Sequence, residues 1–225
     1  KNEYTIFLSN ILVPLIYEGI KKLYMQSIEL EKQFATLKID NPNIDNPGVL
    51  KIFQIFLKGI KSLNSSKIEE ECIRIKERSK CAEWFDDLIK AVVKSNIVLL
   101  TYNASGKTCQ LVNEKLHNTI DTNTFVHKCY IECAKLFFNY PELFWHEYST
   151  IEIKRNQREA HDIIKLAMCE AIRKMLPMKL ILEEYLKNDY INESEILDDE
   201  SEIHANNIKK MVRKDLHNDN LHNIF

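Results

Sequence analysis

Apolar residues along this chain recur at three- and four-residue intervals, which is the spacing of one face of an α-helix. The longest stretch of this kind runs from Ile151 to Leu186. As one helix it would be about 50 Å long, at about 1.5 Å per residue. Pro177 lacks a backbone donor and its ring collides with the preceding turn, so we expect a kink there. The apolar face of this predicted axial helix consists of Ile153, Ala160, Ile164, Ala167, Ala171 and Met175.

Other segments show the same spacing and also predict helices. Pro14 either bends the first of them or lies near the first turn of a second helix. Ile39–Gly48 contains two Asn-Pro steps and a glycine, which predicts a linker, and Asn64-Ser65-Ser66 offers a helix N-cap. The stretch Tyr102–Asn123 is the least regular part of the chain. The remaining predicted helices are Tyr4–Leu37, Val49–Leu63, Ile68–Arg78, Ala82–Leu100 and Thr124–Asn139.

Turn-forming residues are scarce in this chain. Only four glycines and five prolines occur in 225 residues, whereas β-rich folds use such residues freely. We therefore predict an all-α fold, an irregular bundle of about six to eight helices around the axial helix kinked near Pro177.

Charge is distributed unevenly near the C-terminus. Asp189–Ile203 contains seven acidic residues and no basic one, and Lys209–Lys214 is basic. Charge blocks of this kind are typical of a mobile tail or of a segment that becomes ordered on a partner. We predict a single helical domain over residues 1–186, followed by such a tail over residues 187–225.

The whole chain is nearly neutral, with 31 basic and 33 acidic residues, which argues against an electrostatic footprint for nucleic acid over the entire surface. Its six cysteines include no CxxC pair and fit neither a zinc module nor a secreted disulfide scaffold. We expect buried free thiols in a reducing compartment. Ile6–Ile16 is too short to span a bilayer and has no basic segment before it, so we expect a soluble, intracellular protein.

Few residue patterns here indicate chemistry. Cys129 and Cys133 lie one helical turn apart near His127, but no second pair completes a tetrahedral metal site. Gly106-Lys107-Thr108 resembles the end of a phosphate-binding loop but lacks the second glycine five residues earlier. Asp86 and Asp87 would point about 100° apart on a helix, which disfavours joint acid–base work. We expect no catalytic, cofactor-binding or metal-binding residues, no small-molecule ligand and no enzyme activity.

A basic stripe and several large aromatic residues are the candidate contact surfaces. The stripe consists of Lys154, Arg155, Arg158, Lys165 and Arg173. It could pair with neighbouring carboxylates on the same helix, contact a partner protein, or hold nucleic-acid phosphates. The candidate aromatic anchors, which suit cores and interfaces alike, are Trp84, Tyr140, Phe144 and Trp145.

Several segments together resemble a known family. They are LVPLIYEGIKKLY from Leu12, KIFQIFLKGI from Lys51, SKCAEWFDDLIKAV from Ser79, FVHKCYIECAKLFF from Phe125, and KRNQRE from Lys154 with IRKMLPMKLILEEYL. In order and spacing they are similar to an uncharacterised helical family of nucleocytoplasmic large DNA viruses, mimivirus-like and related giant viruses. The resemblance covers residues 4–186 and fails in the charged tail. It implies a viral protein made in host cytoplasm, and it transfers no catalytic residue.

Two functions follow as expectations. The first is a non-enzymatic virion structural protein, a minor capsid or capsid-associated component whose partners are other virion proteins. The second is an intracellular adaptor or nucleic-acid-associated factor of the viral factory that uses the basic face of residues 152–176. In either case we expect no membrane span.

Overall fold

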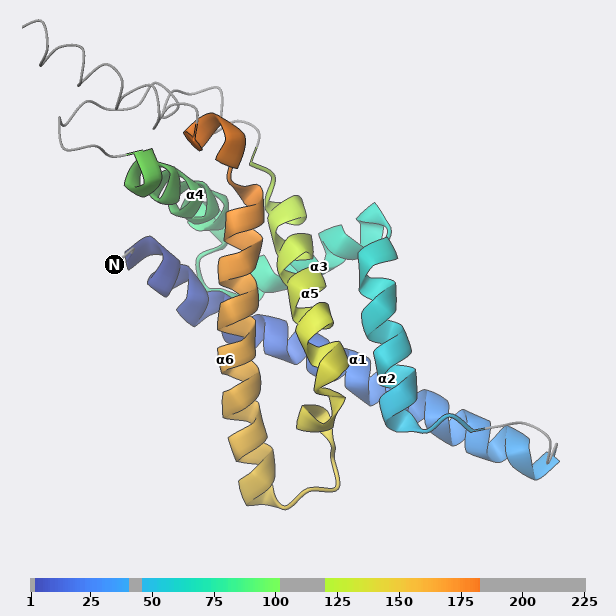
Figure 1. Cartoon of the computed structure of the whole chain (residues 1–225). Helices are drawn as coiled ribbons and strands as arrows, with labels where there is room; N and C mark the ends of the chain where they lie inside the picture. The colour runs from blue at the N-terminus through green and yellow to red at the C-terminus, as the bar shows by residue number, and fades with distance from the viewer. Residues whose placement is uncertain (1–2, 41–45, 102–119, 183–225) are drawn as a thin grey trace, which may run out of the picture. The chain divides into compact units, whose positions relative to one another are not determined.

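The computed structural model describes residues 3–40, 46–101 and 120–182, and these residues form helices and short connections with no β-strand among them (Figure 1). The all-α prediction is confirmed. The α-helices are α1 (Glu3–Asp40), α2 (Val49–Gly59), α3 (Ser65–Arg78), α4 (Phe85–Thr101), α5 (Thr122–Asn139) and α6 (Thr150–Met175). Short 3-10 helices are η1 (Ile60–Ser62), η2 (Ala82–Trp84) and η4 (Pro141–Phe144). Within the described ranges, every helix is too short or too polar to cross a bilayer.

The chain divides into two compact units. Of the described residues, 3–40, 46–99 and 120–177 belong to the first, and 100–101 and 178–182 to the second. The sites below all lie in the first unit. The predicted tail, 187–225, lies outside the described residues, as does the loop-like motif at residues 106–108.

Helix α1 is the longest described element and carries much of the core. It contacts α2, α3 and α6, while α5 and α6 pack side by side (Figure 1). Pro14 lies inside α1, so the single-helix alternative is the correct one. Pro14 is exposed. Water can therefore reach the backbone carbonyl of the preceding turn, which receives no hydrogen bond because proline has no N–H. Core residues with almost no exposure include Leu12, Ile16, Ile20, Tyr24, Phe53, Phe85, Phe125 and Phe137.

Helix α6 is shorter than the predicted axial helix. It begins at a capping box. The Glu152 backbone N–H donates a hydrogen bond to the Ser149 side chain, and the Ser149 backbone N–H donates one to the Glu152 carboxylate. It ends at Met175, because Leu176 adopts an extended conformation (φ −74, ψ 136) in front of Pro177. Helix resumes at Met178. Pro177 therefore interrupts the helix rather than kinking it.

Side-chain caps also fix the starts of α3 and α5. The Asn64 side chain accepts a hydrogen bond from the Lys67 backbone N–H at 3.0 Å, so α3 begins three residues before the predicted Ile68. The Asp121 carboxylate caps α5 in the same way, through the Thr124 backbone N–H at 2.9 Å.

Candidate functional site

A hollow of about 480 Å³ lies between α1, η1, α3 and α5. Polar side chains from two helices, α3 and α5, converge on it, among them Glu71, Arg74, His127 and Tyr130. Sequence reasoning did not bring these residues together. A convergence of this kind would indicate an active site if the groups were free to react. The hydrogen bonds of each group show whether it is free.

The Arg74 guanidinium is fully engaged by neighbouring groups. It donates from Nε and Nη2 to the two Glu71 carboxylate oxygens, at 2.8 and 2.6 Å. Nη1 lies 3.3 Å from Glu18 Oε2, and Nη2 donates to the Leu15 carbonyl at 2.8 Å. Hydrogen bonding to Glu71 raises the pKa of Arg74 above its ordinary value. This side chain therefore ties α3 to α1 and offers no free donor fork to an anion.

Tyr130 completes the network from α5. Its hydroxyl is buried and donates to Glu71 Oε1. Burial first, and the negative charge of Glu71 second, raise its pKa well above the ordinary value. The phenol is therefore neutral at physiological pH, and Glu71, which accepts donors from Arg74 and Tyr130, is not a free base. We conclude that Glu71, Arg74 and Tyr130 form a structural clamp between α1, α3 and α5.

Gly19 of α1 makes the clamp possible. A Cβ at this position would overlap the Tyr130 hydroxyl and approach Glu71 Oε1 to 2.9 Å. Glycine inside a helix costs about 1 kcal/mol of stability relative to alanine. The close approach of Tyr130 and Glu71 to the α1 backbone explains why this position is a glycine. Gly19 was the one signal in the sequence that could have located this cluster, because a glycine inside a helical pattern usually has a packing role.

His127, Cys129 and Cys133, which the sequence analysis weighed and rejected as a metal site, do not converge on a common point. His127 Nε2 lies 2.8 Å from the Ile60 carbonyl, to which it donates when that nitrogen carries the proton. Cys129 and Cys133 are completely buried in the core instead. Across residues 3–40, 46–101 and 120–182, no group of three His, Cys, Asp or Glu side chains is placed to hold a metal ion.

The buried thiols should be chemically inert in the folded protein. Burial raises the pKa of Cys72 to about 12, and it raises the pKa values of Cys129 and Cys133 well above the ordinary value. We expect a thiol-exchange reagent to label no more than two cysteines quickly. These are Cys169, which is partly exposed, and Cys109, which lies outside the described residues. The buried Cys81 should also label slowly, the labelling rate of Cys72, Cys129 and Cys133 should stay low up to about pH 10, and all six thiols should react in denaturant. Fast labelling of more than two thiols in the native protein would contradict this packing.

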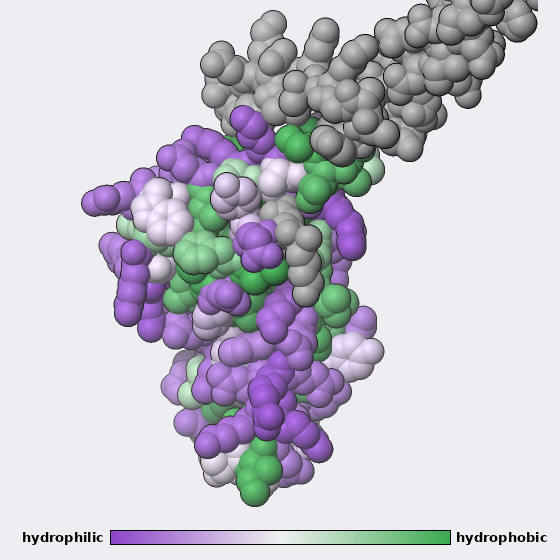
Figure 2. All heavy atoms as spheres, turned by 90° about the vertical axis from the view of Figure 1, so that its left-hand side faces the viewer, coloured by the Kyte–Doolittle hydropathy of each residue, from purple (hydrophilic) through white to green (hydrophobic). Residues whose placement is uncertain are grey.

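The basic stripe divides into two parts on α6. Lys165 pairs with Asp162 at 2.9 Å and Arg173 with Glu170 at 3.3 Å. By contrast, Lys154, Arg155 and Arg158 are exposed, and no carboxylate of the described residues lies within 4.0 Å of them. Figure 2 shows that the face over the lower part of α6 is largely hydrophilic.

The predicted aromatic anchors occupy different environments. Phe144 is 7% exposed, and its ring packs 5.0 Å from that of Phe137 and 5.3 Å from that of Phe53, between centroids. Trp145 is partly buried beside His146, and Tyr140 is 50% exposed. Phe144 is therefore a core residue.

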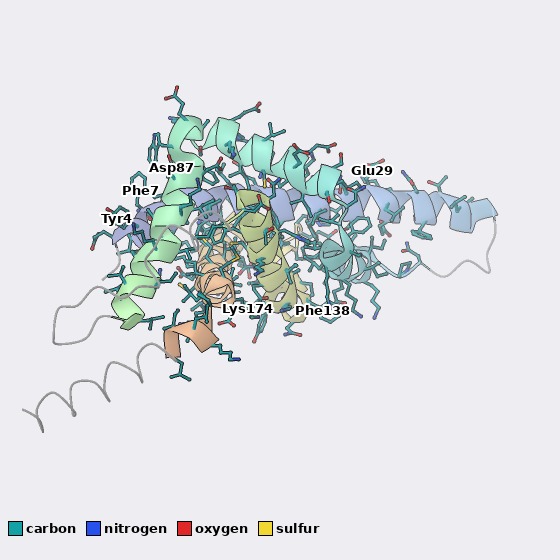
Figure 3. The ribbon with its side chains drawn as sticks, turned by 90° about the horizontal axis from the view of Figure 1, so that it is seen from above. Tyr4, Phe7, Glu29, Asp87, Phe138 and Lys174 are labelled. Atoms are coloured by element: carbon teal, nitrogen blue, oxygen red, sulfur yellow. The ribbon has the colours of Figure 1, made fainter. Side chains whose placement is uncertain are left out.

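Trp84 belongs to an exposed aromatic patch. Its ring stacks on that of Phe7, 5.8 Å away and 26° from parallel, although the two side chains are 44% and 47% exposed. Tyr4, one turn before Phe7, is also exposed (Figure 3). We call Tyr4, Phe7 and Trp84 the aromatic patch. Figure 2 shows apolar and pale residues gathered in the upper half of its face, where α4 and the start of α1 lie.

Comparison with known proteins places residues 1–145 in a protein family. The model of a family described as a family of unknown function, DUF5764, matches residues 1–145. No curated protein and no solved structure matches the chain.

Proposed function

We propose that this chain, which belongs to the DUF5764 family of unknown function, is a non-enzymatic structural protein that acts by contacting neighbouring proteins. Its resemblance to proteins of giant DNA viruses supports a virion as the assembly, with the chain as a minor capsid or capsid-associated component. The proposed location is the virion, after synthesis in host cytoplasm.

The observation that carries the proposal is the aromatic patch. Trp84 and Phe7 come from η2 and α1, which are far apart in the sequence, and yet their rings stack on the surface. Large aromatic side chains held on rigid elements supply most of the energy at protein interfaces and lose little conformational entropy when a partner binds. The clamp and the buried thiols support a role outside catalysis, because their reactive groups are engaged or inaccessible.

Quantitative mass spectrometry of purified particles tests the proposal. We expect the chain at a fixed ratio to the major virion proteins, and its absence from particles would refute a virion role. Truncating an anchor at an interface costs on the order of 2 kcal/mol, which corresponds to about a 30-fold loss of affinity. Phe7→Ser with Trp84→Ser should therefore deplete the chain from particles.

Leu166→Ser with Tyr140→Ser is a matched control, because both residues are similarly exposed but lie outside the aromatic patch. The control chain should enter particles normally. If it is depleted as strongly as the patch variant, or if the folded patch variant is incorporated normally, the aromatic patch is not the contact surface.

A nucleic-acid-associated role is the second candidate, and it is favoured because no carboxylate of the described residues lies within 4.0 Å of the exposed Lys154, Arg155 and Arg158 side chains. Three phosphate contacts would give a slope of about −2.7 for log K against log salt on duplex DNA. Changing all three residues to Glu should abolish retention on DNA. Retention that is flat with salt, or absent in the unaltered protein, would exclude this role.

A further inference from the structure

An apolar groove of about 330 Å³ lies between α2 with η1 on one wall and α5 on the other. Leu57, Ile131, Ala134 and Phe138 line its floor and sides. Leu57 and Ala134 are buried, whereas Ile131 and Phe138 are only partly covered. The Gln54 side chain donates to the Phe138 carbonyl at 2.8 Å, which fixes the end of α5 against α2. The groove is therefore a shaped feature of two packed helices.

Three lysines surround this apolar floor, and they come from both walls. Lys58 and Lys61 belong to the α2–η1 wall and Lys135 to the α5 wall. All three are exposed. The Lys58 ammonium lies 4.8 Å above the centre of the Phe138 ring, so a cation is held at the groove edge.

Carboxylates of the described residues neutralise these cations only in part. Lys135 pairs with Glu132 at 2.7 Å, but Glu132 also accepts a hydrogen bond from Lys174 at 2.8 Å. Lys58 and Lys61 have no carboxylate of the described residues within 4.0 Å. The groove thus combines an apolar floor with a net positive rim.

We propose that this groove binds an acidic amphipathic helix of a partner protein. Such a helix would insert apolar side chains between the walls and place carboxylates on both flanks, facing Lys58 and Lys61 on one side and Lys135 on the other. Charge complementarity selects this partner, because a neutral apolar helix would leave the lysines unpaired. Nucleic acid fits less well, because the floor offers apolar carbon rather than donors for phosphate.

This groove shares no residue with the aromatic patch, so its role does not depend on the proposed virion function. The test uses the full-length chain and a fluorescent synthetic peptide, an amphipathic helix with leucine on one face and glutamate on the other. Fluorescence anisotropy should show saturable binding that weakens as salt rises. A carbodiimide, which joins carboxylates to amines, should cross-link the peptide to Lys58, Lys61 or Lys135.

Lys58→Glu with Lys61→Glu should weaken peptide binding at least tenfold. Lys51→Glu with Lys94→Glu changes net charge equally and alters exposed lysines outside the groove, so this variant should bind within twofold of the unaltered chain. Circular dichroism verifies that both variants fold. A peptide with glutamine in place of glutamate should bind at least tenfold more weakly.

Four results would overturn the inference: no binding, equal weakening in both lysine variants, cross-links confined to other lysines, or equal binding of the glutamine peptide. Phosphatidylglycerol vesicles that displace the peptide and lose binding in the Lys58 and Lys61 variant would show instead that the groove recognises an anionic lipid surface.

Discussion

Phe144→Ala should destabilise the folded chain by about 3–5 kcal/mol, the usual cost of removing a fully packed phenylalanine. Phe144 lies in η4 and its ring meets those of Tyr17, Tyr24, Phe53 and Phe137. These rings come from α1, α2 and α5, so one side chain joins three helices. Aromatic pairs contribute about 0.5–1.5 kcal/mol beyond their buried area, and the truncation removes several such pairs together. Chemical denaturation followed by circular dichroism measures the change in the free energy of unfolding.

Tyr140→Ala is the matched control for this change. Tyr140 precedes η4 in the chain, and its ring is half exposed, so truncation should alter the free energy of unfolding by no more than about 0.5 kcal/mol. If Phe144→Ala does not fold, Phe144→Leu retains most of the volume but loses the aromatic pairs, so it should cost less than Phe144→Ala and more than Tyr140→Ala. Equal small effects at Phe144 and Tyr140 would contradict the packing described for η4.

Helical periodicity was sufficient to predict the elements, because the core of this fold is built from helix faces. The apolar positions Ala160, Ile164 and Ala167 of the predicted axial helix are all buried. Helix starts were less predictable, since several nearby polar side chains can cap a helix and only the folded backbone selects one. The effect of Pro177 was underestimated, because the restriction that proline imposes on Leu176 competes with an otherwise continuous pattern.

Helical periodicity carries no information on tertiary contacts. These contacts determine which aromatic residues are buried and which polar residues meet. Phe144 and Trp84 are similar as residue types, yet one is in the core and the other on the surface. The difference arises because η4 lies over the meeting point of three helices, whereas η2 lies at the start of α4. The clamp was equally hidden: Glu71 and Arg74 are neighbours on α3, but only the approach of α5 to Gly19 brings Tyr130 to them.

Gly19→Ala should destabilise the chain by about 2–3 kcal/mol, although alanine is the better helix former by about 1 kcal/mol. The new methyl group would overlap the Tyr130 hydroxyl and crowd Glu71. Tyr130 would have to move from a buried position and give up its hydrogen bond, which costs about 1–3 kcal/mol, and overpacking adds a comparable amount. Chemical denaturation of the variant and the unaltered chain measures the difference.

Gly59→Ala provides the control, because no atom lies within 4 Å of a Cβ built there and its φ of −66 suits any residue. This change should be neutral or stabilise the fold by up to about 1 kcal/mol. Tyr130→Phe removes the overlapping oxygen, so Gly19→Ala should cost at least about 1 kcal/mol less in that background. Additive effects of the two changes would mean that Gly19 and Tyr130 do not touch. Coupling between them would establish that α1 and α5 touch at Gly19 and Tyr130, where the Tyr130 hydroxyl also donates to Glu71.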